Sequence, residues 1–271
     1  MIFISGGAGS IGSILVKNLA SKGEKIVVFD SNEYGLFKLK AELGTDNIEY
    51  NLGSLKNWRA IMHSMRTYTD TVIHLASLKN IAITEQNIRE TISSNVIGTL
   101  NLIEAAQIKG VKKFITISSD KSVDFSSVYG ATKFIQEKAT LAANKSKHGG
   151  LFSVLRMVNV METRGNVWET WEKQKNQGLP LTITDPEMKR RFIGIYDVID
   201  YITYVIENMK GGETFITNTK EVKMMDLAES LSKNIKTIGR REGEKLSERI
   251  MTEEEEKKAV ECKPGLLVIK S

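Results

Sequence analysis

Short apolar runs alternate with amphipathic stretches through the first part of the chain. The runs are short enough for buried strands, and the stretches between them repeat apolar residues at helical spacing. Strands are predicted at residues 1–4, 25–29, 48–51, 71–75, 114–117 and 152–157. Helices are predicted at residues 11–22, 33–43, 55–65, 85–109 and 125–144. This alternation with short connections predicts an α/β fold with a parallel, doubly wound sheet.

The pattern loosens after about residue 156. Further helices are predicted at residues 166–176, 196–209 and 224–236, and short strands at residues 181–183, 214–217 and 266–269. A highly charged stretch covers residues 239–258, and its run of four glutamates is interpreted as a solvated helix start. We expect a main domain over residues 1–158 and a smaller lobe over residues 159–271, partly interleaved with it.

Composition narrows the class of protein. The chain has 271 residues, of which 41% are hydrophobic and 26% charged, as expected for one large core with a small appended lobe. The formal net charge is +5, but the basic residues are spread along the chain. This spread disfavours nucleic-acid binding and suits an anionic small-molecule substrate.

Cysteine and histidine usage excludes two further classes. Cys262 is the only cysteine and the three histidines are scattered, so neither an internal disulfide nor a metal site is expected. Apolar runs stay shorter than the roughly 18 residues that a membrane helix needs. The N-terminus has the pattern of a strand and not of a signal peptide. We therefore expect a cytoplasmic protein without a membrane partner.

A glycine-rich turn, SGGAGSIG at residues 5–12, joins the first strand to the first helix. Such a turn lets the backbone approach a pyrophosphate that lies on the helix N-terminus. The second strand ends in Asp30, and an acid there accepts hydrogen bonds from the adenosine ribose and repels a 2′-phosphate. This favours NAD over NADP as cofactor. The alternative is a purely structural turn.

The stretch with the most candidate catalytic side chains is SSDKSVDFSSVYGATK, residues 118–133. Tyr129 and Lys133 are four apart, so they share one face of a helix that begins near residue 126. A lysine ammonium near the phenol would favour the phenolate and make Tyr129 a usable acid–base group.

Polar residues also follow two of the predicted strands. Ser119, Asp120 and Lys121 would lie at the carboxyl end of the strand at residues 114–117, where open α/β sheets place their ligands. His74 ends another apolar strand and is interpreted as a packed residue beside the cofactor.

Several blocks together have a familiar pattern. SGGAGSIG with Asp30, HLASLKN, NVIGT and the Tyr129–Lys133 pair resemble an extended short-chain dehydrogenase/reductase. The chain more narrowly resembles the CapD-like family of UDP-N-acetylglucosamine 4,6-dehydratases of polysaccharide biosynthesis. That resemblance rests on FDSNEYGLFKL, HLASLKNIAITEQN, SSDKSV, YGATK, RMVNVMETRGNV, LTITDPEMKRRF and GRREGEKLSERIMTEEE.

The resemblance implies a Rossmann-type fold, a bound NAD and a small C-terminal substrate-binding lobe. In that family, residues at the places of Ser119 and Tyr129 hold the sugar 4-hydroxyl, and the tyrosine removes its proton while NAD accepts the C4 hydride. Asp120 would be the acid and Lys121 the base of the elimination that follows. Lys133 would tune Tyr129 and contact the ribose.

Further positions carry over from the family's binding sites. The cofactor would contact Gly6, Gly9, Ser10, Ile11, Gly12, Asp30, Ser54, Leu75, Ala76, Asn95, Tyr129 and Lys133. The UDP-sugar would contact Lys79, Glu85, Asn159, Arg190, Arg241 and Glu244. The chain departs from the family pattern at Ser54, Asn80 and Arg191, where the family usually has an acid, a histidine and often an aromatic residue.

The resemblance favours conversion of UDP-N-acetylglucosamine to a UDP-4-keto-6-deoxy sugar, with or without 5-epimerisation, for surface polysaccharide or glycan synthesis. A nucleotide-sugar 4-epimerase is the alternative, and it needs no acid–base pair for elimination. A non-catalytic NAD-binding regulatory protein is the third hypothesis, and it would be expected to lose Tyr129 or Lys133. The resemblance also implies a homodimer or higher homo-oligomer that pairs through the helices at residues 85–109 and 125–144.

Overall fold

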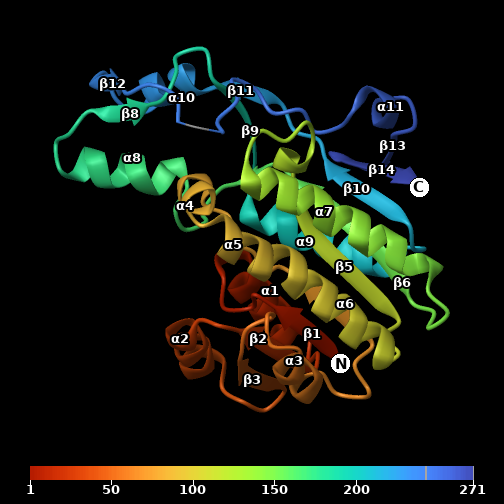
Figure 1. Ribbon diagram of the computed structural model, residues 1–271. Helices are drawn as coiled ribbons and strands as arrows, with labels where there is room; N and C mark the ends of the chain where they lie inside the picture. The colour runs from red at the N-terminus through yellow and green to blue at the C-terminus, as the bar shows by residue number, and fades with distance from the viewer. Residues whose placement is uncertain (242, 271) are drawn as a thin grey trace.

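The computed structural model describes residues 1–241 and 243–270 and shows helices on both faces of one large sheet (Figure 1). In these residues, nine strands form that sheet in the order β13-β14-β10-β6-β5-β4-β1-β2-β3. They are β1 (Ile2–Ser5), β2 (Ile26–Asp30), β3 (Ile48–Leu52), β4 (Thr71–His74), β5 (Lys113–Ser119), β6 (Leu151–Met157), β10 (Glu213–Thr217), β13 (Val260–Lys263) and β14 (Leu266–Lys270). All neighbours from β3 to β10 are parallel, whereas β14 and β13 are added antiparallel.

Side-chain alternation along the strands divides the core into two layers. Ile4 packs toward α1 (Ser10–Ser21), α2 (Glu33–Leu43) and α9 (Ile195–Asn208). Phe3 packs on the opposite face, toward α3 (Trp58–Ser64), α6 (Gly98–Ile108) and α7 (Val128–Ala142). Burying each such side chain is worth about 1.5–3 kcal/mol, so a one-residue slip of β1 is strongly disfavoured.

The strand order reverses at β1, which pairs with β2 on one side and β4 on the other. The chain therefore leaves the carboxyl ends of these strands toward opposite faces, and a crevice opens between them. This arrangement confirms the predicted Rossmann-type, doubly wound fold.

The single helix predicted at residues 85–109 is wrong. The chain there forms α4 (Ile81–Gln86), α5 (Ile88–Thr91), the π-helical segment η1 (Ile92–Ile97) and α6. Asn80 caps α4 by accepting a hydrogen bond from Ile83 N at 3.1 Å, and Asn87 lies outside both short helices. The helical periodicity continues across this break, so the apolar pattern does not reveal it.

Residues after β6 also build a separate end of the molecule (Figure 1). Its elements are β7 (Asn159–Val160), α8 (Val167–Asn176), β8 (Leu181–Ile183), β9 (Lys189–Ile193), β11 (Glu221–Lys223), α10 (Met224–Leu231) and β12 (Ile235–Thr237). A small core around Trp171, Leu181 and Met224 holds α8, β8 and α10 together. The helix predicted at residues 224–236 is too long, because Ile235 begins a strand that pairs with β8.

The same part of the chain completes the main sheet through β10, β13 and β14. The division at residues 158 and 159 therefore stays a prediction. None of the helices in residues 1–241 and 243–270 is long and apolar enough to cross a membrane.

Candidate active site

The glycine-rich turn between β1 and α1 lies against the loop that follows β4. Gly6 has φ of +74°, and a Cβ on it would lie 2.6 Å from Ala76 N. A Cβ on Gly12 would overlap the Gly6 carbonyl oxygen. The first turn of α1 also has no side-chain cap and no acidic residue. Its amide groups are therefore free to meet an anion such as a phosphate.

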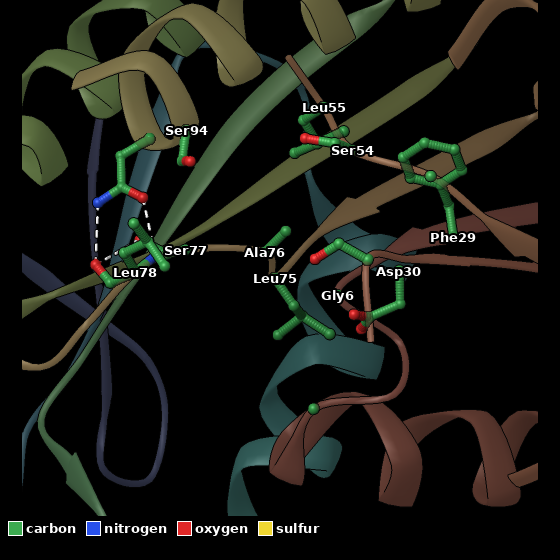
Figure 2. Close-up of a pocket in the computed structure, with 14 residues that line it drawn as sticks. Gly6, Phe29, Asp30, Ser54, Leu55, Leu75, Ala76, Ser77, Leu78 and Ser94 are labelled. Atoms are coloured by element: carbon green, nitrogen blue, oxygen red, sulfur yellow. Dashed lines mark hydrogen bonds between the residues drawn. The ribbon is translucent and has the colours of Figure 1, made fainter. Parts of the chain in front are cut away.

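A cavity of about 250 Å³ opens at the crevice between β1 and β4 (Figure 2). It brings together the predicted cofactor residues Gly6, Gly9, Asp30, Ser54, Leu75, Ala76 and Asn95. The sequence did not predict Phe29, Ser31, Gly53, Leu55, Ser77, Leu78 and Ser94, which complete its wall. The other predicted residues lie outside this wall: Ser10, Ile11 and Gly12 in α1, and Tyr129 and Lys133 in α7.

Asp30 is held firmly at the end of β2. Its carboxylate accepts hydrogen bonds from Ala8 N and Asn32 N, each at 2.9 Å. The remaining lone pairs can accept from a ribose diol, and the negative charge opposes a 2′-phosphate.

Asn95 fixes the loop after β4 from the π-helical segment. Its side chain accepts from Leu78 N at 2.8 Å and donates to Leu78 O at 2.9 Å, and it also donates to Thr132 of α7. His74 is fully buried between Ser5 and Thr99 at 2.8 Å from each hydroxyl, and burial, aided by the charge of Lys133, lowers its pKa to about 3. His74 is therefore a packed residue, as predicted.

Helix α7 begins where the sequence predicts, with Ser127 accepting from Gly130 N at 3.1 Å. Tyr129 and Lys133 are both buried. Lys133 Nζ donates to Ile117 O at 2.8 Å, and burial lowers the pKa of Lys133 to about 7.

The pKa of the Tyr129 phenol differs from the expectation. Burial raises the pKa of Tyr129 well above its ordinary value, and a hydrogen bond with Ser119 only partly opposes that shift. In this structure Lys133 Nζ donates to the Ile117 carbonyl and not to the phenol, so the tuning of Tyr129 by Lys133 stays a prediction.

Asp120 and Lys121 lie together in the short turn η2 (Asp120–Ser122) directly after β5. Lys121 Nζ donates to Asp120 Oδ1 at 3.0 Å and to Asn159 Oδ1 at 3.2 Å. Ser119 Oγ also donates to Asp120 Oδ1 at 3.0 Å. Among the described residues, the buried Asp120 Oδ2 has no hydrogen-bond partner. One carboxylate oxygen is thus fixed by two donors while the other remains available.

A second cavity of about 300 Å³ begins at Lys121 and extends into the C-terminal part. It brings together Lys79, Lys121, Asn159, Arg190, Arg241 and Glu244. Burial lowers the pKa of Lys79, and the charges of Arg164 and Lys121 add to that shift. Glu85 does not line this cavity, because its carboxylate accepts from Val128 N at 2.6 Å in the first turn of α7.

Both arginines that were predicted to contact the substrate also form hydrogen bonds with the charged segment. The Arg190 guanidinium donates to Lys245 O at 2.9 Å and to Leu246 O at 3.2 Å. Arg241 N donates to the Glu244 carboxylate at 3.0 Å. Arg190 therefore fastens the charged segment at the rim of the second cavity, and both arginines add positive charge to its lining.

The positions where the chain departs from the family pattern have defined contacts. Ser54 lines the first cavity and accepts from Lys56 N at 3.3 Å, and Asn80 caps α4. The Arg191 guanidinium donates to the Thr219 carbonyl, between β10 and β11.

Three groups near the site were missed by the sequence reasoning. Glu248 is buried beside Lys121 and Asp120, and burial is the main reason that the pKa of Glu248 is raised. Arg156 pairs with Glu137 of α7 at 2.7 Å and with Glu255 at 2.9 Å. The third is Arg164, whose guanidinium donates to Ala8 O of the glycine-rich turn.

The interpretation of the glutamate run as solvated is wrong for Glu255. The run does form a short helix, α11 (Glu253–Glu256), with Thr252 and Glu255 in a capping box. Glu255 nevertheless reaches the buried Arg156 of β6 and fastens the charged segment to the sheet.

Fold and site together define an extended short-chain dehydrogenase/reductase, because a glycine-rich turn at the switch point of a doubly wound sheet occurs with a buried tyrosine and lysine one helical turn apart. The chain belongs to the family of polysaccharide biosynthesis proteins, whose pattern it matches over residues 2–269. The predicted family is confirmed.

Named relatives fall into more than one activity class. A UDP-N-acetylglucosamine 4,6-dehydratase (inverting) from Campylobacter jejuni is 36% identical over 91% of this chain and 76% of the relative. A UDP-glucose 4-epimerase from Rickettsia rickettsii is 31% identical over 95% of this chain and 79% of the relative. The X-ray structure of Pen from Bacillus thuringiensis superposes with a TM-score of 0.94 at 32% identity, covering 100% of this chain and 89% of that one.

Proposed function

We propose that the protein is an NAD-dependent nucleotide-sugar 4,6-dehydratase that acts on UDP-N-acetylglucosamine for polysaccharide or glycan synthesis. The observation that carries this proposal is the Asp120–Lys121 pair, 3.0 Å apart beside the buried Tyr129 and at the edge of the second cavity. An acid and a base on neighbouring side chains suit removal of water across two adjacent carbons.

NAD fits the residues of the first cavity. Gly6 and Gly12 leave room for a diphosphate on the α1 N-terminus, and Asp30 stands where a ribose diol needs an acceptor. When bound, NAD supplies hydride acceptance from the sugar C4 and hydride return at C6. The acid at position 30 favours NAD over NADP.

Two hydroxyls prepare the oxidation. Ser119 and Tyr129 would hold the sugar 4-hydroxyl, and Tyr129 would take its proton. Burial opposes ionisation of this phenol, and a nearby positive charge favours it. Lys133, one helical turn away on α7, is the residue proposed to supply that charge.

Asp120 and Lys121 would carry out the elimination. Transfer of one proton from the Lys121 ammonium to the Asp120 carboxylate converts their ion pair into a neutral amine and a carboxylic acid. The amine then accepts the C5 proton, and the acid protonates the departing 6-hydroxyl. The two groups end as the ion pair with which they began, so the site is ready for another turnover.

The alternative is a nucleotide-sugar 4-epimerase, and the Rickettsia relative is the observation in its favour. Epimerisation needs the oxidation groups alone and gives no role to Lys121. A regulatory protein without catalysis is disfavoured, because Tyr129 and Lys133 are both present and buried beside the crevice.

Incubation of the purified protein with UDP-N-acetylglucosamine tests the proposal. We expect mass spectrometry to detect a product that has lost one water, with a carbonyl that hydrazine reagents trap. An isomer of unchanged mass would instead establish the epimerase. For the dehydrated product, proton NMR would give the configuration at C5.

We also propose that two copies of the chain pair through the outer faces of η1, α6 and α7, which lie along one side of the molecule (Figure 1). Large apolar side chains are exposed there, including Ile97 at 46%, Leu100 at 44% and Ile135 at 44%. Apolar residues gathered on neighbouring helices are typical of an interface.

Light scattering is expected to give the mass of a dimer or a multiple of it. The double variant Ile97→Glu, Ile135→Glu should elute as a monomer, because four carboxylates would be buried at each interface. Tyr196→Glu, on the exposed side of α9, is the matched control and should leave the mass unchanged. A monomeric native protein would contradict the proposed pairing.

A further inference from the structure

The loop between β7 and α8 reaches across the molecule to the glycine-rich turn. Arg164 Nη2 donates to Ala8 O at 3.0 Å. Arg164 N donates to Ser10 Oγ at 3.0 Å, and Arg164 Nε approaches the same oxygen at 3.4 Å. These contacts join residues more than 150 positions apart, so the fold itself, and not a local turn, places the guanidinium on this turn.

Basic groups of two segments meet near this turn. The α1 N-terminus has no acidic residue in its first turn, and Lys79 Nζ donates to Arg164 O at 3.0 Å. Arg164 forms no ion pair with a carboxylate in residues 1–241 and 243–270. The nearby Glu169 is engaged by Lys173 at 2.7 Å and by Gly165 N at 2.6 Å. The guanidinium therefore has no direct carboxylate partner among these residues and can meet an external anion, while Glu162, Glu169 and Glu172 line the cavity that Arg164 borders on its other side.

We propose that Arg164 is a further cofactor-binding residue, which closes over the glycine-rich turn and donates to the cofactor diphosphate. Two of its five N–H groups are used by Ala8 and Ser10, which leaves donors for a phosphate oxygen. The inference rests on the proposed dinucleotide cofactor, and it does not depend on which reaction follows.

The position of this loop gives the contact a second consequence. Gly165 and Asn166, which follow Arg164 directly, line the second cavity together with Lys79. A ligand in that cavity therefore touches the same short loop that holds Arg164 on the cofactor turn. Occupation of the second cavity by UDP should slow the release of the dinucleotide, because the loop cannot lift from one cavity without disturbing the other.

Binding of NADH, followed by its fluorescence in the purified full-length protein, tests the role of Arg164. We expect Arg164→Ala to weaken NADH and ADP about tenfold, as for loss of one charge-assisted contact to a phosphate. Arg164→Lys should recover part of the affinity. The difference from the native protein should shrink as salt is added. With UDP present, NADH should leave the native protein more slowly, and this effect should be lost in Arg164→Ala.

Lys175→Ala is the matched control, because it removes an equal charge from the exposed face of α8. Adenosine, which has no phosphate, should compete equally well in the native protein and in Arg164→Ala. NADH affinity within twofold of native in Arg164→Ala would overturn the proposal, and so would an equal loss for adenosine. Should Arg164→Ala fail to fold in circular dichroism, Arg164→Gln takes its place with the same criteria. A native protein that binds NADH but forms no dehydrated product would overturn the dehydratase and leave the Arg164 test intact.

Discussion

Tyr129→Phe is expected to abolish both the oxidation of the sugar and the loss of water. The phenol is buried, and it is the group proposed to remove the proton of the 4-hydroxyl. A positioned acid–base group contributes about 10²–10⁴-fold to rate, so turnover should fall by roughly 10³-fold or more. Because elimination needs the 4-keto sugar, the second step stops with the first. Absorbance of reduced nicotinamide and mass spectrometry of the product report the two steps separately.

Tyr204→Phe is the matched control for this experiment. Its phenol donates to Cys262 O at 2.8 Å on the far side of the sheet, so the variant loses a hydroxyl without touching either cavity. Thermal unfolding of Tyr129→Phe should stay close to that of the native protein. Hydride transfer that survives in a folded Tyr129→Phe would show that another group removes the proton.

Sequence reasoning succeeded where neighbouring residues along the chain carry the information. The glycine-rich turn, Asp30 and the spacing of Tyr129 and Lys133 are local patterns, and the structure places them at one crevice or on one helix face. Parallel strands then bring separate local patterns together, because their carboxyl ends share one edge of the sheet. These two rules, together with the family resemblance, predicted half of the residues that line the first cavity.

Contacts between segments that are distant in the sequence could not be predicted. Strand β9 begins Lys189-Arg190-Arg191, and a run of three cations has no strand pattern until β7 and β11 pair with it. Arg164 meets the glycine-rich turn only through the path of the loop after β7. Nothing in the local pattern of either segment indicates such a contact.

The glutamate run shows the same limit in its electrostatics. Four consecutive carboxylates favour a solvated surface, and three of them fit that reading. Glu255 instead pairs with Arg156, which also holds Glu137 on the helix of Tyr129 and Lys133. Ser122, in the turn of Asp120 and Lys121, lies 2.7 Å from the same Glu137 carboxylate. A buried arginine with two acidic partners therefore links the C-terminal segment to both halves of the catalytic group.

Lys121→Ala is expected to stop the loss of water while hydride transfer to the cofactor survives. Lys121 lies beside Asp120 and is the proposed base at C5, whereas the oxidation at C4 belongs to Ser119 and Tyr129. Reduced nicotinamide should therefore accumulate with substrate and fail to return its hydride. Dehydration should fall by roughly 10²–10⁴-fold, the usual contribution of such a group.

Lys121→Arg makes the test sharper, because Lys121→Ala leaves the buried Asp120 without its ion-pair partner. An arginine keeps the positive charge beside Asp120 yet stays protonated, so it cannot accept the C5 proton. Both variants should behave alike in chemistry, although the arginine variant should unfold at a temperature closer to native. Lys112→Ala, at an exposed lysine before β5, controls for the loss of one charge.

The two lysine variants also decide between the proposed activities. A dehydratase loses its product in both variants, because neither variant has a neutral amine at position 121 to accept the C5 proton. An epimerase keeps its isomer in both, because inversion at C4 uses the oxidation groups alone. Normal dehydration by Lys121→Arg would transfer the role of base to another group, and the buried Glu248 beside this pair would be the first candidate. The outcome at this single side chain thus separates loss of water from inversion within one fold.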